Sequence, residues 1–379
     1  MNICVITPSF YPAVYWGGPI YSTKGLCQAL AVNKGIVLRV LTTDTSGPTS
    51  NDRLIIEDLP EGFPSNFLVY YCKKSFGKDV SLEFFVKLIP MVKWADVIYL
   101  NGVYSPPTIP VLIACRLLKR PVIWATRGAL QRWEGSTNRS IKVVWEYICR
   151  TIIHPSRTVL HVTSQEEADA AKSRMPNVPL SVIQNGVEIP EVEKDRKWIP
   201  QGCIRLLYLG RLHPIKGLEN LIGSLTLPGA KNAKLTLAGD GDSRYRDKLE
   251  KLVLDNKLDR RVSFLGHVSG DEKHNLFLNS DVCIMPSYTE NFGMVVAEAL
   301  AHGLPVIASK GTPWSRVVGE GCGLWVENSP EALSKAIGSM ELANLKEMGE
   351  KGRKWMMRDY SWSGVSGELL AVCEGLLNQ

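Results

Sequence analysis

The 379-residue chain lacks the features that mark membrane and secreted proteins. No apolar run approaches the roughly 20 residues that a membrane-spanning helix needs. The first residues carry neither the basic region nor the cleavage site of a secretory signal, and we expect residues 3–7 to form a buried first strand instead. The sequence therefore predicts a cytoplasmic protein.

Several motifs of cofactor enzymes and hydrolases are missing as well. The chain has no GxGxxG fingerprint and no P-loop lysine, which argues against dinucleotide oxidoreductases and P-loop kinases. HExxH and GxSxG are absent, so hydrolases lack support. The nine cysteines are scattered without a CxxC pair, a pattern that favours small buried hydrophobes in a reducing compartment over disulfides or a metal site. We expect no metal and no resident cofactor.

Length and hydrophobic patterning indicate an α/β protein of two domains. The chain exceeds the usual single-domain limit, and apolar strand patterns alternate with helical ones. Strands of the first half are expected at residues 3–7, 37–41, 67–71, 97–100, 122–125 and 159–162. A turn at Asn185-Gly186 and a charged stretch at residues 191–200 place the domain boundary near residue 190. The predicted domains are residues 1–190 and residues 191–361.

One expected helix carries an apolar stripe. Leu82, Phe85, Val86 and Ile89 share one face of a helix that Pro90 should end. We interpret this stripe as part of the core, and contact with a membrane is the alternative interpretation.

The net charge of +6 is concentrated in the first half of the chain. Residues 1–190 hold 20 basic against 14 acidic side chains, and residues 71–158 hold 14 against 5. The basic candidates are Lys73, Lys74, Lys78, Lys119, Arg120, Arg132, Arg139, Lys142, Arg150 and Arg157, with Phe76, Trp133 and Trp145 among them. Such a surface suits an anionic membrane or a phosphate-bearing acceptor, and an ordinary solvated surface is an equal alternative. No recognition motif supports a nucleic-acid partner.

Residues 290–298 form the most informative stretch, Glu-Asn-Phe-Gly-Met-Val-Val-Ala-Glu. An apolar strand pattern precedes it and a helical one follows, so the loop amides should lie at a helix N-terminus, where anions are favoured. Glu290 and Glu298 offer carboxylates for hydroxyl groups. The amides come from Asn291, Phe292, Gly293, Met294 and Val295. The alternatives are two surface glutamates beside a buried helix, or the carboxylate pair of a glycoside hydrolase, which requires a separation of about 5 Å that this spacing disfavours.

Three other segments accompany this stretch in a specific order. They are Gly-Arg-Leu-His-Pro-Ile-Lys-Gly at residues 210–217, Ala-Gly-Asp-Gly at residues 238–241, and Gly-Leu-Pro-Val-Ile-Ala-Ser at residues 303–309. Together they resemble the retaining glycosyltransferases of family 4, and the resemblance spans nearly the whole chain. It implies the GT-B architecture, in which two Rossmann-like domains with parallel sheets face each other across a deep cleft. The last helix, within residues 362–379, would return to the N-terminal domain.

The resemblance implies metal-independent transfer of a hexosyl unit from a nucleoside diphosphate sugar, with UDP or GDP as the nucleotide, to an acceptor hydroxyl. Arg211 and Lys216 would stabilise the leaving diphosphate, and fixed cations of this kind favour such a transition state. Glu290 would hold hydroxyls of the sugar and Glu298 those of the ribose. Residues that would line the nucleotide pocket are Gly210, Gly239, Asp240, Gly241, His267 and Val268. A DxD metal motif at residues 240–242 is the alternative interpretation of that turn.

Two predictions concern the first domain. Gly17 and Gly18 precede a helix, and the resemblance assigns them to the donor phosphates across the cleft, although a flexible turn would have the same pattern. Many family members place a histidine where this chain has Thr-Arg-Gly-Ala-Leu at residues 126–130. Arg127 cannot be a general base because it stays protonated, but it could position the donor. This departure favours proton transfer from the acceptor to the leaving diphosphate.

The acceptor is expected to be lipid-linked or a saccharide, as in assembly of cell-surface polysaccharide or lipopolysaccharide, with peripheral contact at the inner membrane face. Alternatives are a sugar-nucleotide epimerase or a glycogen-synthase-like polymerase of the same architecture, and a non-catalytic subunit that binds nucleotide sugars.

Overall fold

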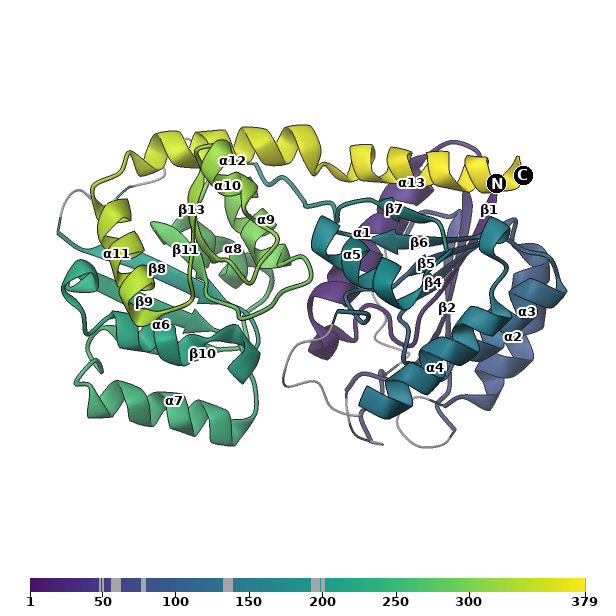
Figure 1. The fold of residues 1–379 in the computed structure, drawn as a ribbon, viewed down its shortest axis with the longest axis horizontal. Helices are drawn as coiled ribbons and strands as arrows, with labels where there is room; N and C mark the ends of the chain where they lie inside the picture. Colours follow the sequence, from purple (N-terminus) through teal and green to yellow (C-terminus); the bar gives the residue numbers. More distant parts are fainter. Residues whose placement is uncertain are drawn as a thin grey trace. The chain divides into compact units, whose positions relative to one another are not determined.

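Alternating strands and helices build two parallel sheets, one in each half of the chain (Figure 1). A computed structural model describes residues 1–47, 49, 51–55, 63–75, 80–131, 139–191, 198 and 202–378. Contacts divide the chain into a first unit, Met1–Gly186 with Trp362–Gln379, and a second unit, Val187–Ser361. The predicted fold class, two Rossmann-like α/β domains with parallel sheets, is confirmed. Lys78, Arg132, Phe76 and Trp133 of the predicted basic surface, and most of the charged stretch 191–200, lie outside the described residues.

The first sheet has its change of strand order at the centre. Its strands are β1 (Asn2–Ile6), β2 (Val37–Thr43), β3 (Phe67–Cys72), β4 (Val97–Asn101), β5 (Val122–Ala125), β6 (Thr158–Val162) and β7 (Leu180–Val182). They are ordered β3-β2-β1-β4-β5-β6-β7, and β1 pairs in parallel with both β2 and β4. Open α/β sheets bind ligands outside the carboxyl ends of the strands at such a switch point. The short strand β7 was not among the predicted ones.

Helices cover both faces of this sheet. They are α1 (Gly18–Val32), α2 (Leu82–Trp94), α3 (Thr108–Leu117), α4 (Arg139–Ile152), α5 (Gln165–Arg174) and α13 (Trp362–Leu377). Because side chains alternate along a strand, Cys4 and Ile6 pack toward α2, α3, α4 and α5, whereas Ile3 and Val5 pack toward α1 and α13. Trp362 anchors α13, since a Cβ on Gly25 or Gly186 would lie within 2.5 Å of its ring. No helix in the described part of the chain combines the length and apolarity that crossing a bilayer requires.

The prediction for α2 was wrong in two respects. The helix continues past Pro90 to Trp94, because a proline removes a single backbone hydrogen bond and tertiary packing outweighs that loss. The stripe of Leu82, Val86 and Ile89 is exposed. The core receives the opposite side of the helix, namely Phe84, Leu88, Met91 and Val92, so the apolar pattern fits two faces and only one is buried.

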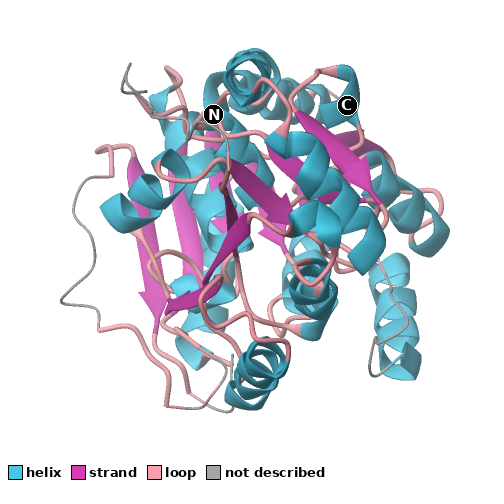
Figure 2. Ribbon diagram, turned by 90° about the vertical axis from the view of Figure 1, so that its left-hand side faces the viewer, coloured by secondary structure: helices cyan, strands magenta, loops and turns pink. Residues whose placement is uncertain are grey.

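The second sheet is also parallel, and its strand order also changes inside the sheet. Figure 2 draws its strands and helices. Its strands are β8 (Ile204–Leu209), β9 (Ala233–Ala238), β10 (Val262–Gly266), β11 (Val282–Met285), β12 (Val306–Ser309) and β13 (Gly323–Val326). Its helices are α6 (Leu218–Ser224), α7 (Ser243–Asp255), α8 (Gly270–Leu278), α9 (Met294–Ala301), α10 (Arg316–Gly319), α11 (Pro330–Glu341) and α12 (Leu345–Asp359). The order β10-β9-β8-β11-β12-β13 puts the switch point between β8 and β11.

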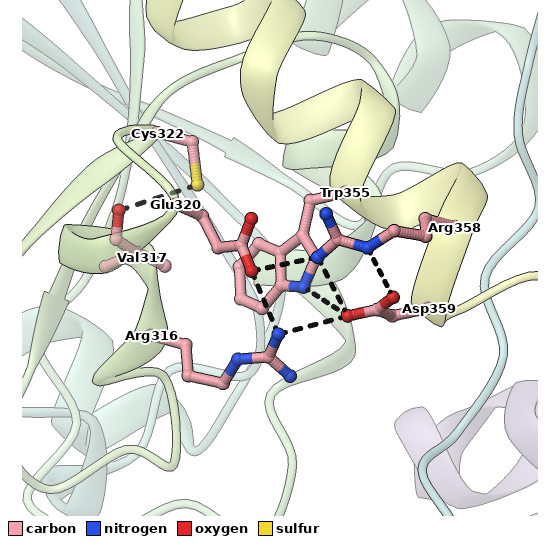
Figure 3. A network of polar contacts seen from close by, with 7 residues as sticks. All are labelled: Arg316, Val317, Glu320, Cys322, Trp355, Arg358 and Asp359. Carbon is pink, nitrogen blue, oxygen red and sulfur yellow. Dashed lines mark hydrogen bonds and ion pairs between the residues drawn. The ribbon is translucent and has the colours of Figure 1, made fainter.

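A surface network joins α10 to the end of α12 in the second unit (Figure 3). Arg316 contacts Glu320 at 2.9 Å and Asp359 at 3.1 Å, and Arg358 contacts the same two carboxylates. The indole of Trp355 donates to Asp359 at 2.9 Å. Hydrogen bonds to Asp359 from Arg358 first, and then from Trp355 and Arg316, lower the pKa of this carboxyl group. Because both arginines are more than half exposed, the network fixes local geometry more than it adds stability.

The cysteines behave as the sequence predicts. All nine are free, and eight of them are buried. Burial raises the pKa of Cys283 in β11 to about 12, so this thiol remains protonated and apolar at neutral pH.

Candidate functional site

An ion pair stands at the switch point of the second sheet. Lys216 lies at the end of a short 3₁₀ turn after β8, and Glu290 lies in the loop after β11. The Lys216 ammonium contacts the Glu290 carboxylate, and the Ser287 hydroxyl lies 3.4 Å from the same carboxylate. Both side chains are mostly buried, with 15% and 18% exposed. A backbone bond of 2.8 Å from Tyr288 N to Ile215 O holds the two loops together, so the fold unites two residues predicted for the site.

Arg211 belongs to the same loop as Lys216 but is exposed. Within the described residues its guanidinium makes no hydrogen bond or ion pair, and only its carbonyl is used, by the Tyr208 hydroxyl at 2.9 Å. Burial, and the positive charges of Arg211 and Lys216, lower the pKa of His213 between them. The neutral ring accepts a hydrogen bond at Nδ1 from Ile215 N at 3.2 Å. The loop thus presents one paired and one unpaired cation.

The N-terminus of α9 is shaped by two residues before it. Gly293 has φ +77°, and a Cβ there would lie 3.1 Å from Cγ of Glu290 and 3.2 Å from the indole nitrogen of Trp314. The Trp314 indole donates to the carbonyl of Phe292, whose ring packs 5.3 Å from that of Trp314. α9 begins at Met294, and Val296 N already donates to the carbonyl of Gly293 at 2.9 Å. The amides of Met294 and Val295, at the start of the helix, are therefore the ones that suit an anion.

Two buried acceptors in this stretch lack a donor. Glu298 Oε1 pairs with Lys273 of α8 at 2.7 Å, whereas Glu298 Oε2 has no partner among the described residues. The same holds for Oδ1 of Asn291. Buried polar atoms are nearly always hydrogen-bonded, so two orphaned acceptors within eight residues are the arrangement expected where hydroxyl or amine donors of a ligand bind.

Close backbone packing brings the other predicted nucleotide residues to the same sheet edge. Gly239 has φ +135°, and a Cβ there would lie 2.1 Å from the carbonyl oxygen of Gly210. Gly239 N donates to Gly266 O at 2.6 Å, and Leu212 N donates to Asp240 O at 2.8 Å. Backbone hydrogen bonds and close contacts therefore hold the turns after β8, β9 and β10 together. A larger residue at Gly239 would push these turns apart.

Side chains in these turns differ in their surroundings. Asp240 and His267 are exposed, and Val268 is buried. Gly241 packs so closely that a Cβ would lie 2.0 Å from the carbonyl oxygen of Leu212. Asp242, the second aspartate of the DxD alternative, accepts from Tyr245 N at 3.2 Å and caps α7. That hydrogen bond explains the aspartate without a metal.

The predicted loop of the first unit follows β1. Gly17 has φ +68° with open space around its Cβ position, and Gly18 begins α1. The buried indole nitrogen of Trp16, next to these glycines, has no acceptor among the described residues. The loop thus offers helix amides and one unused donor at the carboxyl end of β1.

Arg127 forms a polar hub in the first unit. It has φ +51°, and its guanidinium uses all five N–H groups within the protein. The acceptors are Asn101 at 2.9 Å, Asn185 at 3.0 Å, Thr23 and Tyr99 at 3.2 Å, and Ser22 at 3.3 Å. A donor or acceptor molecule would have to displace one of these bonds, so the observed role of Arg127 is to tie α1, β4 and β5 together.

Some residues that organise these loops carry no signal in the sequence. Glu167 is fully buried, and it accepts hydrogen bonds from the Thr126 hydroxyl at 2.6 Å and from Thr163 N at 2.8 Å, which anchors the loop that bears Arg127. Lys273 and Trp314 likewise lie far along the chain from the residues they contact. A lone lysine or tryptophan on a helix or loop resembles a solvated or core residue, so these three residues cannot be recognised from the sequence.

Comparison with known proteins assigns the second half of the chain. Residues 191–355 match the family described as Glycosyl transferases group 1. An uncharacterized glycosyltransferase of Methanocaldococcus jannaschii is 31% identical over 217 residues. That alignment covers 52% of this chain and 54% of the relative, so the chain spans about half the length of that relative.

Solved structures match the whole fold. Sucrose-phosphate synthase from Thermosynechococcus elongatus superposes with a TM-score of 0.76 at 22% identity and covers 100% of this chain and 99% of its own. Anabaena HepE in complex with UDP gives 0.75 at 17% identity, with 99% and 100% covered. These likenesses show the fold, which is GT-B. Residues 191–355 of this chain are therefore a domain of the glycosyl transferases group 1 family, set in a GT-B protein.

Proposed function

We propose that this protein is a retaining glycosyltransferase of family 4 that moves a hexosyl unit from a nucleoside diphosphate sugar to an acceptor hydroxyl. The carrying observation is the mostly buried Lys216–Glu290 pair at the switch point of the second sheet. Close to it in the chain, Asn291 before α9 and Glu298 within α9 each have a buried acceptor atom that no donor of the described residues reaches. This combination offers a cation for phosphate and acceptors for sugar and ribose hydroxyls.

The chemistry follows from charge. As the acceptor oxygen attacks the anomeric carbon, the bond from that carbon to the diphosphate breaks, and negative charge grows on the leaving group. Lys216, which its pair with Glu290 holds in place, and Arg211 are cations of one loop, and positive groups near the leaving group stabilise the charge that develops there. The diphosphate then takes the acceptor proton on the face it leaves, so configuration is retained and no protein base is required. Lys216 and Arg211 would take the part that a metal ion plays elsewhere.

The comparisons support a uridine nucleotide as the first candidate for the donor. HepE has been solved with UDP and with UDP-glucose, and we propose UDP or GDP as the donor nucleotide here. The acceptor would be lipid-linked or a saccharide, in assembly of cell-surface polysaccharide or lipopolysaccharide. Glu298 would bind the ribose, Glu290 the transferred sugar, and the turns at Gly239 and His267 the nucleotide. Gly17 and Gly18 remain predicted sources of phosphate-binding amides.

Thermal-shift measurements with a panel of nucleoside diphosphate sugars, without added metal, test the donor site. We expect one UDP or GDP sugar to stabilise the protein, and we expect Lys216→Ala and Glu298→Ala to weaken that shift strongly. Lys248→Ala is the matched control, because Lys248 forms another lysine–glutamate pair in the same unit but is 66% exposed. Equal shifts in Lys216→Ala and the control would contradict the proposed site.

Turnover distinguishes the transferase from the alternatives. With a labelled donor, a transferase gives a labelled acceptor and a free nucleoside diphosphate, whereas an epimerase gives an isomeric sugar nucleotide and a silent subunit gives neither. Losing one charge-stabilising donor typically costs about 3 kcal/mol, or 10²- to 10³-fold in rate. We therefore expect Lys216→Ala to lower kcat by about that factor.

A further inference from the structure

Helix α8 packs against α9 through a buried aromatic ring. Phe277 of α8 is fully buried and belongs to the same hydrophobic cluster as Val296 and Leu300 of α9. Lys273 precedes Phe277 by four residues, so both side chains project from the same side of α8. The packing of the two helices therefore brings a cation to the middle of α9.

Glu298 of α9 is held at both its side chain and its backbone. Of the described residues 296–301, only Glu298 is not buried, and its side chain is 19% exposed. Lys273 Nζ lies 2.7 Å from Oε1 of Glu298, and the lysine side chain is 24% exposed. Nδ1 of His302 donates to the carbonyl of Glu298 at 2.6 Å, and Nε2 of His302 lies 3.1 Å from Nδ1 of His274 on α8. Contacts that involve α8 thus fix the position of this glutamate.

The two carboxylate oxygens of Glu298 have different surroundings. Oε1 accepts from the Lys273 ammonium, whereas Oε2 is buried and no donor in the described part of the chain reaches it. A pair with a structural role alone would leave the second oxygen in water or give it a protein donor, because buried polar atoms are nearly always hydrogen-bonded. A carboxylate anchored at one oxygen cannot rotate freely. The pair therefore presents one oriented acceptor, which suits a hydroxyl group.

We propose that Lys273 is a positioning residue for the donor nucleotide and holds Glu298 in the orientation that binds the ribose hydroxyls. This inference rests on the donor site proposed above, in which Glu298 binds the ribose. Its consequence is selectivity for ribonucleoside diphosphates. A nucleotide whose sugar lacks these hydroxyls would leave the buried Oε2 without a donor, and sites built to bind a hydroxyl reject analogues that lack it.

Calorimetry with two nucleotides tests the proposal. The nucleotides are whichever of UDP or GDP stabilises the protein, and the 2′,3′-dideoxy form of the same nucleotide. The natural protein should bind the ribonucleotide about 10- to 100-fold more tightly, because the dideoxy form cannot make hydrogen bonds to the charged carboxylate.

Substitutions of Lys273 separate positioning from a structural role. Lys273→Met removes the charge and leaves an unbranched apolar side chain. It should weaken binding of the ribonucleotide about 2- to 10-fold, which is the cost of ordering a released side chain, and leave binding of the dideoxy form unchanged. Lys273→Arg should restore most of the lost affinity. Glu298→Gln should lower the preference for the ribonucleotide as well.

Turnover gives a second measurement. The ribose contacts are the same before and during transfer, so Lys273→Met should raise KM for the donor and leave kcat unchanged. Lys216→Ala, in contrast, is expected to lower kcat. Lys351→Met is the matched control, because Lys351 forms another lysine–glutamate pair of 2.7 Å in the same unit but is 50% exposed. This control should change neither KM nor the binding of either nucleotide.

The outcomes distinguish this inference from the proposed function. If neither UDP nor GDP binds the natural protein, the donor site itself is wrong and the inference fails with it. If the ribonucleotide binds but Lys273→Met weakens both nucleotides equally, or neither, only the role of Lys273 is overturned. Equal binding of the two nucleotides by the natural protein would also overturn it. Circular dichroism establishes that each variant is folded, and Lys273→Gln replaces Lys273→Met if the latter does not fold.

Discussion

His161 of β6 should remain uncharged far below the pH at which an ordinary histidine titrates. Its ring is buried between two partners, the hydroxyl of Tyr99 at 2.7 Å from Nδ1 and the carbonyl of Ile183 at 2.8 Å from Nε2. A carbonyl can only accept, so Nε2 carries the proton and Nδ1 accepts from Tyr99. Burial first, and then the positive charge of Arg127, lower the pKa of His161 to about 3.

The lowered pKa makes stability depend on pH. The unfolded chain protonates this histidine near pH 6.5, whereas the native protein does so only near pH 3. The unfolded state therefore binds more protons between these values, so the stability present above pH 6.5 is lost as pH falls. Each pKa unit corresponds to about 1.4 kcal/mol, which gives about 1 kcal/mol lost at pH 5.5 and about 5 kcal/mol in total.

Nuclear magnetic resonance of histidine-labelled protein measures the pKa of His161 directly. The chain has six histidines, and His161→Asn identifies the signal of interest by its loss. We expect no titration of that signal between pH 8 and pH 5. Urea unfolding at pH 7.5 and 5.5 should show a stability loss that is about 1 kcal/mol smaller in His161→Asn than in the natural protein. A midpoint near pH 6.5 for this imidazole would refute the reasoning.

Three further outcomes are expected. Gly239→Ala should lower stability by at least about 2 kcal/mol in urea unfolding, because its Cβ would lie 2.1 Å from Gly210 O at φ +135°; Gly367→Ala, with open space around it, should have little effect. Trp314→Phe keeps an aromatic ring but removes the N–H bonded to Phe292 O, so it should cost about 1–3 kcal/mol in unfolding and weaken donor binding in calorimetry; unchanged donor affinity would contradict the positioning role. Turnover should be equal in EDTA and in Mg²⁺, and a rate that falls in EDTA would contradict the metal-free proposal.

Much of the secondary structure follows from local sequence. The first strands could be predicted because β1, β4 and β5 are buried on both faces and read as short apolar runs. The face of α2 could not, because its residues are apolar on two sides and Pro90 resembles an end signal. Which side is buried depends on where the sheet lies, and residues within one helix do not encode that position.

The sequence by itself determined the α/β class and the loops that follow the strands, because apolar period and glycine placement act over a few neighbouring residues. It also identified Lys216 and Glu290 as separate candidates. Only the tertiary structure decided that these two side chains, 74 residues apart, form an ion pair. It also decided that Lys273 pairs with Glu298 and that the guanidinium of Arg127 donates its hydrogen bonds to groups inside the protein. The physical reason is that ion pairs and hydrogen bonds depend on distances between strands, and the order of strands in a parallel sheet sets those distances.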